Sequence, residues 1–300
     1  GEAKVEATKT PKHRDLYATV TEKIISALEA GVRPWERPWK KTGAPTIAKP
    51  MRSTGEHYRG INVLLLWGAS LERGYSCNRW FTFNQAKAAG AHVRRGEQGA
   101  MVVYAGQFEQ KDDAEDDGAN THRKVGGMFL RASTVFNAEQ LNGLEPSGEQ
   151  EAGPALTGEV QGFFDRVGAR VLHGGDRAYY MPSADVVQLP PVAAFKDSGA
   201  YCATRTHELI HWTGHPSRLA RGFGQRFGDQ AYAFEELVAE LGAAFVCADL
   251  GLATEARDDH AAYLQHWLAV LRQDKRAIFT AARHAQRAAD FLMQRGGEHA

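Results

Sequence analysis

The chain has 300 residues, in which 36 lysines and arginines balance 36 aspartates and glutamates, and 43 % of the residues are hydrophobic. This composition is typical of a globular protein, and the length suffices for one large or two ordinary domains with substantial cores. No apolar run reaches the length of about 18 residues that a membrane-spanning helix needs, which excludes that class of protein.

The first residues, GEAKVEATKTPKHRDLY, are polar and lack an apolar signal segment. We therefore expect a cytoplasmic location and no membrane partner. The three cysteines, Cys77, Cys202 and Cys247, are scattered without C-x-x-C spacing. This pattern indicates small hydrophobic side chains or surface thiols, not metal ligands or a disulfide framework.

The first third of the chain is basic, because residues 1–104 carry 17 lysines and arginines against 9 acidic residues. Aromatic residues are interleaved with the basic ones in RPWERPWKK (33–41), HYRGIN (57–62), NRWFTFNQ (78–85) and VRRGEQG (93–99). Single-stranded nucleic acid is typically bound by cations on its phosphates and aromatic rings under its bases, so the pattern predicts such binding. The predicted contact residues are Trp35, Trp39, Lys40, Lys41, Tyr58, Arg59, Asn62, Trp80, Gln85, Arg94 and Arg95. The alternative is that tryptophans such as Trp35, Trp39 and Trp80 pack into the core.

The middle of the chain predicts a hairpin followed by a linker. MVVYAGQF (101–108) and GGMFLRASTVF (126–136) are typical of strands, with a charged loop over residues 109–124 between them. LEPSGEQEAGPALTG (144–158) has the composition of a linker. We therefore predict domains over residues 1–145 and 155–300, each with its own core.

The sequence THELIHWTGHPSRL (206–219) contains an H-E-x-x-H motif. Asp197 or Ser198 can cap a helix over residues 199–213, and Gly214 is a suitable C-terminal stop. Positions i and i+4 share one face of a helix, so His207 and His211 can bind one metal ion. Before this helix, RAYYMPSADVVQLPP (177–191) predicts two short strands around its internal proline, one of which could hold an extended peptide.

A third ligand is expected from a following helix over about residues 229–250, because Ser217 stands where a third histidine would extend the motif. Glu236 and Glu240 share a face of that helix, whereas Glu235 falls on the opposite flank of its apolar stripe. We predict that Glu236 binds the metal and that Glu240 accepts the ring N–H of a ligating histidine. The reverse assignment stays open. Further helices are expected over residues 256–272 and 274–294.

Two histidines and one glutamate suit Zn²⁺, although other divalent transition metals such as Mn²⁺ are compatible. Glu208 would then be the general base of a zinc peptidase, taking a proton from the attacking water. The candidates for stabilising the oxyanion are Tyr179, Tyr180, His215 and Tyr232. A structural or vestigial metal site is the alternative.

The order of these segments resembles a known family. LYATVTEKIISALEAG, PWERPWK, YRGINVLLLW and WFTFNQAKAAGAHVRRGEQGAMVVY are similar to the single-stranded-DNA-binding domain of ArdC-type antirestriction proteins and of some conjugative plasmid primases. THELIHWTGHPSRLAR and YAFEELVAELGAAFV are similar to the zincin-type metallopeptidase domain of the same family.

The resemblance implies a two-domain α+β protein, with a small α+β DNA-binding domain before a helix-rich zincin-like domain. It implies a mobile-element protein that protects incoming DNA from restriction, with single-stranded DNA as partner and His207, His211, Glu208 and a glutamate of EELVAE in the metal site. The protein substrate is unidentified, with the host restriction machinery as one candidate. The competing hypothesis is a non-catalytic shield that protects DNA by occupying it.

Overall fold

The computed structural model of the chain describes residues 15–36, 48–107, 128–144, 158–222, 230–252 and 260–297. The predicted charged loop (109–124) and nearly all of the predicted linker (144–158) lie outside these ranges, so the exact domain boundary stays a prediction. The described part mixes helices with three small sheets, which confirms the predicted α+β class.

The amino-terminal elements run from α1 to β6. The helices are α1 (Leu16–Glu29), α2 (Ile61–Arg73) and α3 (Phe83–Ala88), with a short 3₁₀ helix at Ala138–Gln140. The main sheet has the order β1-β2-β5-β4, with strands Met51–Arg52, Arg79–Phe81, Met128–Asn137 and Ala100–Gln107. A second small sheet joins β3 (His92–Val93) to β6 (Leu141–Asn142).

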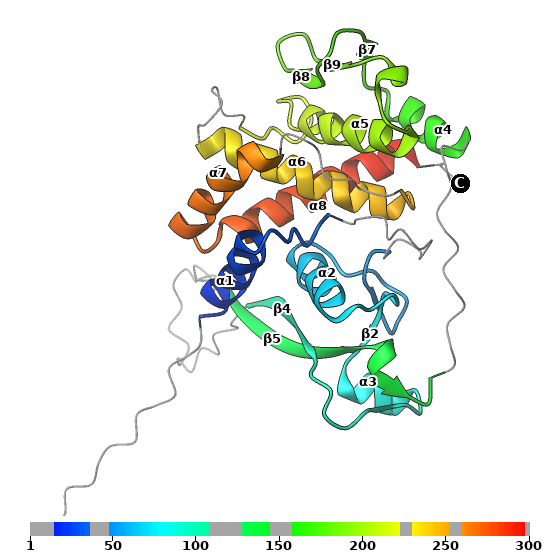
Figure 1. Ribbon diagram of the computed structural model, residues 1–300, viewed down its shortest axis with the longest axis vertical. Helices are drawn as coiled ribbons and strands as arrows, with labels where there is room; N and C mark the ends of the chain where they lie inside the picture. Colours follow the sequence, from blue (N-terminus) through cyan, green and yellow to red (C-terminus); the bar gives the residue numbers. More distant parts are fainter. Residues whose placement is uncertain are drawn as a thin grey trace, which may run out of the picture.

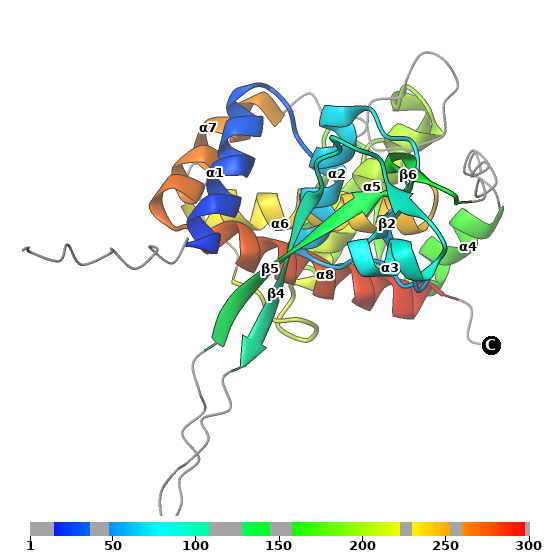
Figure 2. The same cartoon turned by 90° about the horizontal axis from the view of Figure 1, so that it is seen from below.

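Strands β4 and β5 form the predicted hairpin. They pair antiparallel from Ala100 opposite Val135 to Gln107 opposite Met128. Figure 2 shows the two strands crossing this side of the molecule, with their distal ends extending beyond the helices. The predicted hairpin is confirmed.

The carboxy-terminal elements run from α4 (Gly158–Val167) to α8 (Ala277–Gly296). A three-stranded sheet of order β7-β9-β8 comes first, with strands Val171–His173, Val186–Leu189 and Tyr179–Met181. The helices α5 (Ser198–Thr213), α6 (Gln230–Asp249) and α7 (His260–Gln273) follow. These bounds confirm the predicted strands and helices to within a few residues. Within the described ranges, no helix has the length and apolar character needed to cross a bilayer.

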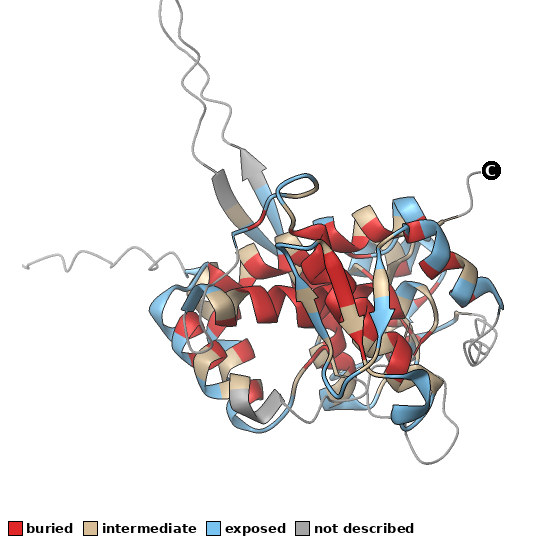
Figure 3. Cartoon of the chain, turned by 90° about the horizontal axis from the view of Figure 1, so that it is seen from above, coloured by how far each residue is buried: buried red, intermediate tan, exposed pale blue. Residues whose placement is uncertain are grey.

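Helix α5 begins and ends where its sequence allows. The side chain of Asp197 accepts a hydrogen bond of 2.8 Å from the backbone N–H of Ala200, and the helix stops before Gly214. The small sheet lies over α5 (Figure 1). Its central strand β9 is largely buried while the strands on either side are more exposed (Figure 3), because Val187 and Leu189 face the core.

The largest cluster of buried apolar residues crosses the predicted domain boundary. Trp67 of α2 packs against Phe245 of α6 with ring centroids 5.9 Å apart, and Trp35 packs against Trp267 of α7 at 6.0 Å. The prediction of two independent cores is therefore wrong. In Figure 1, α2 lies between the main sheet and the layer of α6 and α8, which joins the two halves.

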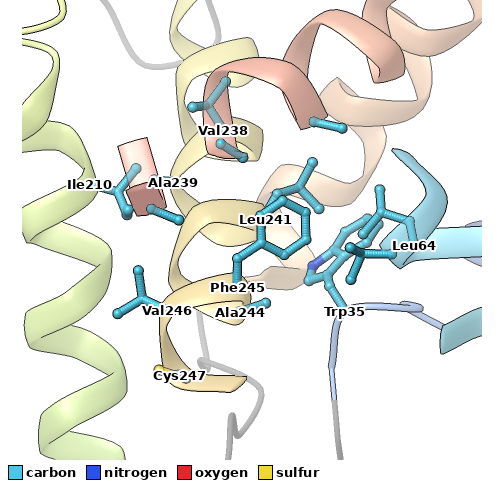
Figure 4. Packing of buried hydrophobic residues seen from close by; sticks show 14 of the residues in the cluster. Trp35, Leu64, Ile210, Val238, Ala239, Leu241, Ala244, Phe245, Val246 and Cys247 are labelled. Carbon is cyan, nitrogen blue, oxygen red and sulfur yellow. The ribbon is translucent and has the colours of Figure 1, made fainter. Parts of the chain in front are cut away.

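Helix α6 is the element that both halves cover. Figure 4 shows Ile210 of α5 beside Ala239 on one side of α6, while Leu241 and Phe245 point toward Leu64 and Trp35 on the other. A helix with apolar residues around most of its circumference must be buried on all sides. Neither half of the chain alone surrounds α6, and this is the physical reason for the shared core.

Polar contacts join the same two halves. The Nζ of Lys49 lies 3.0 Å from Oδ2 of Asp249, in the last turn of α6, and Lys49 is only 5 % exposed. The backbone N–H of Gly60, just before α2, donates to Oε1 of Gln286 on α8 at 3.0 Å. These contacts fix the amino-terminal part to the last turn of α6 and to the middle of α8.

Because the core is shared, we expect the chain to unfold in one transition that Trp67→Ala destabilises by about 3 to 5 kcal/mol. Urea unfolding followed by circular dichroism and tryptophan fluorescence measures this. Phe83→Ala is the control, since Phe83 is 60 % exposed and its loss should change little. Two separate transitions, only one of them shifted by Trp67→Ala, would show independent cores.

Candidate metal centre

The two histidines of the H-E-x-x-H motif lie one helical turn apart on α5 and face the same way. The Nε2 atoms of His207 and His211 are 3.1 Å apart, and the two residues are 2 % and 8 % exposed. Ring nitrogens that meet at this distance either share one proton or direct two lone pairs at one cation. The arrangement is therefore that of a pair of ligands.

Glu236 of α6 completes a cluster of three. Its Oε2 is 3.3 Å from Nε2 of His207, and its Oε1 is 3.3 Å from Nε2 of His211. The candidate ligand atoms of the three residues all lie within 4.8 Å of one another. In a tetrahedral zinc site, bonds of about 2.0 to 2.2 Å place neighbouring ligand atoms about 3.3 to 3.5 Å apart. The observed spacing fits a divalent cation.

A glycine lets α5 approach α6 this closely. A Cβ atom at Gly242 would lie 2.8 Å from Cδ1 of Ile210 and 3.0 Å from its Cγ1 and Cγ2. Glycine in a helix interior costs about 1 kcal/mol relative to alanine, so its presence in the middle of α6 needs a reason. The contact with Ile210 supplies it, because a side chain at position 242 would push α5 and α6 apart.

Each histidine has a second carboxylate at its other ring nitrogen. The Nδ1 of His207 lies 2.9 Å from Oε1 of Glu240, and the Nδ1 of His211 lies 3.3 Å from Oε1 of Glu235. A carboxylate at Nδ1 keeps the ring proton there and leaves the lone pair of Nε2 for a metal. The structure thus brings Glu236 to the metal side and Glu240 to the outer side. It also places Glu235 next to His211, a contact that helical periodicity did not predict.

Glu235 is itself bound by Arg221, which follows α5. The Nη2 of Arg221 donates to Oε1 of Glu235 at 2.8 Å and to the carbonyl oxygen of Ile210 at 2.6 Å, and its Nη1 donates to Oγ1 of Thr213 at 2.9 Å. Burial raises the pKa of Glu235, but the bonds to His211 and Arg221 outweigh it and hold the pKa below its ordinary value. Arg221 therefore keeps this carboxylate ionised and caps the end of α5.

The charges within the cluster support one another. Burial lowers the pKa of His211, but the carboxylates of Glu236 and Glu235 outweigh it and raise the pKa to about 10. Burial raises the pKa of Glu236, yet the two histidines hold it far below its ordinary value. Without a metal, His211 therefore carries a proton at neutral pH, and a metal ion must displace it.

Glu208 and Tyr232 lie beside the cluster. Glu208 directly follows His207 and is 3 % exposed. Tyr232 precedes Glu236 by one turn of α6, so the two share a face. Burial raises the pKa of the Tyr232 hydroxyl, and the nearby carboxylates of Glu236 and Glu208 add to this effect. A phenol and a carboxylate are thus available next to the candidate ligands.

The other three candidates for the oxyanion have different surroundings. The hydroxyl of Tyr180 donates to Oδ1 of Asp185 at 2.8 Å. Tyr179 is 43 % exposed on β8. The Nδ1 of His215 lies 2.7 Å from Oγ of Ser217, within its own turn. The fourth candidate, Tyr232 on α6, is the one that lies beside the metal cluster.

Strand β8 lies at an edge of the small sheet, since β9 is its partner in the sheet order. Its outer backbone groups are available to pair with an extended peptide. Arg218 fixes the turn between β8 and β9 to the metal helix. Its Nη1 donates to Oδ2 of Asp185 at 3.0 Å, and its Nε donates to the carbonyl oxygen of Trp212 at 2.6 Å.

Comparison with known proteins agrees with this geometry. Residues 14–136 match the N-terminal domain of the anti-restriction factor ArdC, and residues 158–284 match a zincin-like metallopeptidase domain. The metal-free crystal structure of the antirestriction protein ArdC from plasmid R388 is 43 % identical, with a TM-score of 0.80, over 94 % of this chain and 98 % of that one. The chain belongs to the ArdC antirestriction family.

Other members and relatives extend the comparison. The Mn(II)-bound structure of R388 ArdC is 42 % identical, with a TM-score of 0.77, over 96 % of this chain and all of that one. The uncharacterized protein y4eC of Sinorhizobium fredii (strain NBRC 101917 / NGR234) is 41 % identical, over 93 % of this chain and 91 % of that protein. A DNA primase TraC of Escherichia coli is 37 % identical over 93 % of this chain, but this match spans 27 % of the primase.

The aromatic rings predicted to stack on bases in this ArdC-family chain are largely in the core. Trp35, Tyr58 and Trp80 are 1 %, 2 % and 0 % exposed. The stacking role predicted for these three is therefore wrong, because buried ring faces already pack against protein. Three further predicted contact residues lie outside the described residues: Trp39, Lys40 and Lys41.

The two predicted amide contacts serve the fold. Asn62 pairs with the outer edge of β4, where its Nδ2 donates to the carbonyl oxygen of Val103 at 2.8 Å and its Oδ1 accepts from the N–H of Val103 at 2.8 Å. The Oε1 of Gln85 accepts from the N–H of Thr82 at 2.8 Å, as half of a reciprocal cap of α3. Both atoms of the Asn62 amide and the oxygen of the Gln85 amide are therefore engaged within the protein.

The three predicted arginines that the structure describes are at the surface. Arg59 forms an ion pair with Asp290 of α8, and Arg94 lies 2.8 Å from Glu97. Arg95 is exposed. Exposed ion pairs are weak, so these arginines can exchange a carboxylate for a phosphate. Their contact with DNA stays a prediction.

Substitution of Glu236, or of Glu235 at the Nδ1 of His211, should reduce metal affinity. We expect Glu236→Ala to weaken binding at least tenfold, and Glu235→Gln to weaken it by about 10- to 100-fold because His211 loses its orienting carboxylate. Competition with a chelator measures both. Glu72→Gln, on the exposed side of α2, is the control. Unchanged affinity in Glu235→Gln would show that this contact does not orient the ligand.

Metal affinity should rise with pH. Because the pKa of His211 is raised to about 10, the metal-free site binds a proton over the whole neutral range, and one displaced proton corresponds to about tenfold in affinity per pH unit. Titration calorimetry at several pH values between 6.5 and 9, in buffers of different ionisation enthalpy, measures both the affinity and the protons released. An affinity that is constant above the ordinary histidine pKa of 6.5 would contradict the raised value.

Proposed function

We propose that this ArdC-family protein is a zinc-dependent peptidase that binds single-stranded DNA and acts in antirestriction. The observation that carries the enzymatic part is the convergence of two imidazole nitrogens and a glutamate carboxylate within 4.8 Å, next to the buried Glu208. Zn²⁺ suits two histidines and one glutamate. Mn²⁺ is the alternative, since R388 ArdC has a Mn(II)-bound structure.

In this proposal His207, His211 and Glu236 hold the ion, and Glu208 carries the proton. A divalent ion in such a site polarises a substrate carbonyl and lowers the pKa of water. Glu208 takes a proton from the attacking water and delivers it to the leaving amine. The Tyr232 hydroxyl, which stays protonated because its pKa is raised, donates a hydrogen bond to the oxyanion that develops on the carbonyl.

Substrate would bind in extended form. The open edge of β8 offers backbone N–H and C=O groups, and the contacts of Arg218 hold the β8–β9 turn against α5. A peptide paired with β8 would be held over the metal helix by main-chain hydrogen bonds. This supports an unfolded or loop segment of a protein as substrate, with a component of the host restriction machinery as the candidate.

The amino-terminal part would supply the DNA contact. It matches the N-terminal domain of anti-restriction factor ArdC, and the chain is similar to a segment of the plasmid-type primase TraC. Its excess of lysine and arginine favours a polyanion. We propose single-stranded DNA entering during conjugation as the ligand, and the cytoplasm as the place where it meets this protein.

The second candidate function is a DNA shield whose metal is structural. The specific observation in its favour is that each histidine is bound on both sides by carboxylates from α6, so an ion there would tie α5 to α6 whether or not it took part in chemistry. A glutamate placed directly after the first ligand favours the enzyme, because a structural site has no use for a general base.

Glu208→Gln separates the two functions. Glutamine is nearly isosteric but cannot take a proton, so we expect metal content and DNA binding to be retained while peptide hydrolysis is lost. Cleavage products in a cell extract, with and without single-stranded DNA, would be compared between wild type and Glu208→Gln by mass spectrometry. The exposed Glu159→Gln, at the start of α4, is the matched control.

Measuring how well wild type and Glu208→Gln protect incoming DNA from restriction then shows which function is responsible for protection. Loss of protection in a Glu208→Gln protein that still binds metal and DNA would mean that proteolysis carries it. Retained protection, which is the outcome we expect, would mean that occupying DNA protects it and that peptide hydrolysis serves a second purpose. Identical peptide products from wild type and Glu208→Gln would overturn the catalytic role of Glu208.

A further inference from the structure

An exposed aromatic residue lies on the amino-terminal sheet where sequence analysis proposed none. Tyr104 on β4 is 37 % exposed, in contrast to the buried Trp35, Tyr58 and Trp80. It belongs to β4, one of the two strands of the hairpin shown in Figure 2. Side chains alternate along a strand, so Tyr104 continues the face on which Val102 and Ala100 enter the core.

Two arginines flank this ring. Arg131 stands directly opposite Tyr104 on β5, so both side chains leave the same face of the sheet. Arg131 is exposed and forms no ion pair with any residue that the structure describes. The guanidinium of Arg52 on β1 lies 5.7 Å from the centroid of the Tyr104 ring and 5.2 Å from that of Tyr58 beneath it.

The charge on Arg52 is available to a ligand. Its ion-pair partner Glu56 is 3.7 Å away and 73 % exposed, which makes the pair a weak one. Its Nε atom is buried, with no hydrogen-bond partner in the part of the chain that the structure describes. The aromatic contacts of Arg52 hold the guanidinium in a fixed place beside Tyr104. Two cations therefore border one exposed ring. The three residues come from three separate strands, β1, β4 and β5.

We infer that Tyr104, Arg52 and Arg131 form a binding platform for single-stranded DNA, in which a base stacks on the ring and the guanidinium groups contact the phosphates on either side. This Tyr104 platform rests on the proposed single-strand binding and assigns it to a surface. Stacking on a flat ring is sequence-tolerant and needs an unpaired base, so the platform discriminates against duplex. Figure 1 places α2 and α8 between this sheet and α5, so DNA bound here does not reach the metal cluster.

The test uses the full-length chain and a fluorescent single-stranded oligo-dT, with the matching duplex as competitor. We expect Tyr104→Ala to weaken binding about tenfold, and Tyr104→Phe to bind within about twofold of wild type because the ring is kept. Arg131→Ala should lower the slope of log affinity against log salt by about 0.7, for one lost phosphate contact. Arg283→Ala removes the same charge from the exposed side of α8 and should leave the slope unchanged.

Photo-crosslinking provides a second measurement that does not depend on variants. An oligonucleotide containing 5-iododeoxyuridine should crosslink to Tyr104, as located by mass spectrometry. A wild-type chain that does not bind the oligonucleotide would overturn the proposed single-strand binding itself. Wild-type affinity in folded Tyr104→Ala, Arg52→Ala and Arg131→Ala proteins, or crosslinks found only outside the hairpin, would overturn the platform alone.

Discussion

The burial of charge between α5 and α6 is the constraint on which the rest of the carboxy-terminal part depends. Four carboxylates from two helices are at most 8 % exposed: Glu208, Glu235, Glu236 and Glu240. Removing an unpaired carboxylate from water costs several kcal/mol, so each needs positive charge nearby. Arg221 compensates Glu235, and the two histidines contact the carboxylates of Glu236 and Glu240. A divalent cation fits the spacing and would add positive charge here, so the pairing of the two helices and the proposed chemistry of the site would have the same electrostatic origin.

Helix α6 connects this charged cluster to the amino-terminal part. Its first half carries the glutamates toward α5, and its second half carries Phe245 and Asp249 toward Trp67 and Lys49. The helix is too apolar to be left uncovered on either side. The two families match separate segments of the chain, but the residues of both segments pack into one shared core. A change in the amino-terminal part can therefore disturb the candidate metal ligands through the position of one helix.

Sequence periodicity predicted the helices, the hairpin and the H-E-x-x-H helix, because these depend on local patterns. It could not choose between Glu236 and Glu240, because both lie on one face of α6. Only the position of α5 against that face distinguishes the two residues. It missed the contact of Glu235 with His211, because α5 also packs beyond the face of α6 that carries Glu236 and Glu240. It also assigned Trp35 and Trp80 to DNA, since an aromatic ring near basic residues suits a core and a stacking site equally well. Tyr104 was overlooked because its arginines are distant in the chain.

The bond between Asn62 and the edge of β4 has a consequence for the hairpin. In a short hairpin the turn fixes the register, but β4 and β5 are joined through residues 108–127, far more than the usual two to five or so. A slip by one residue would turn every side chain of a strand to the opposite face. By bonding both backbone groups of Val103, Asn62 holds β4 against α2 in one register. The joining segment is then free to change in length and sequence during evolution, while the faces of the sheet stay the same.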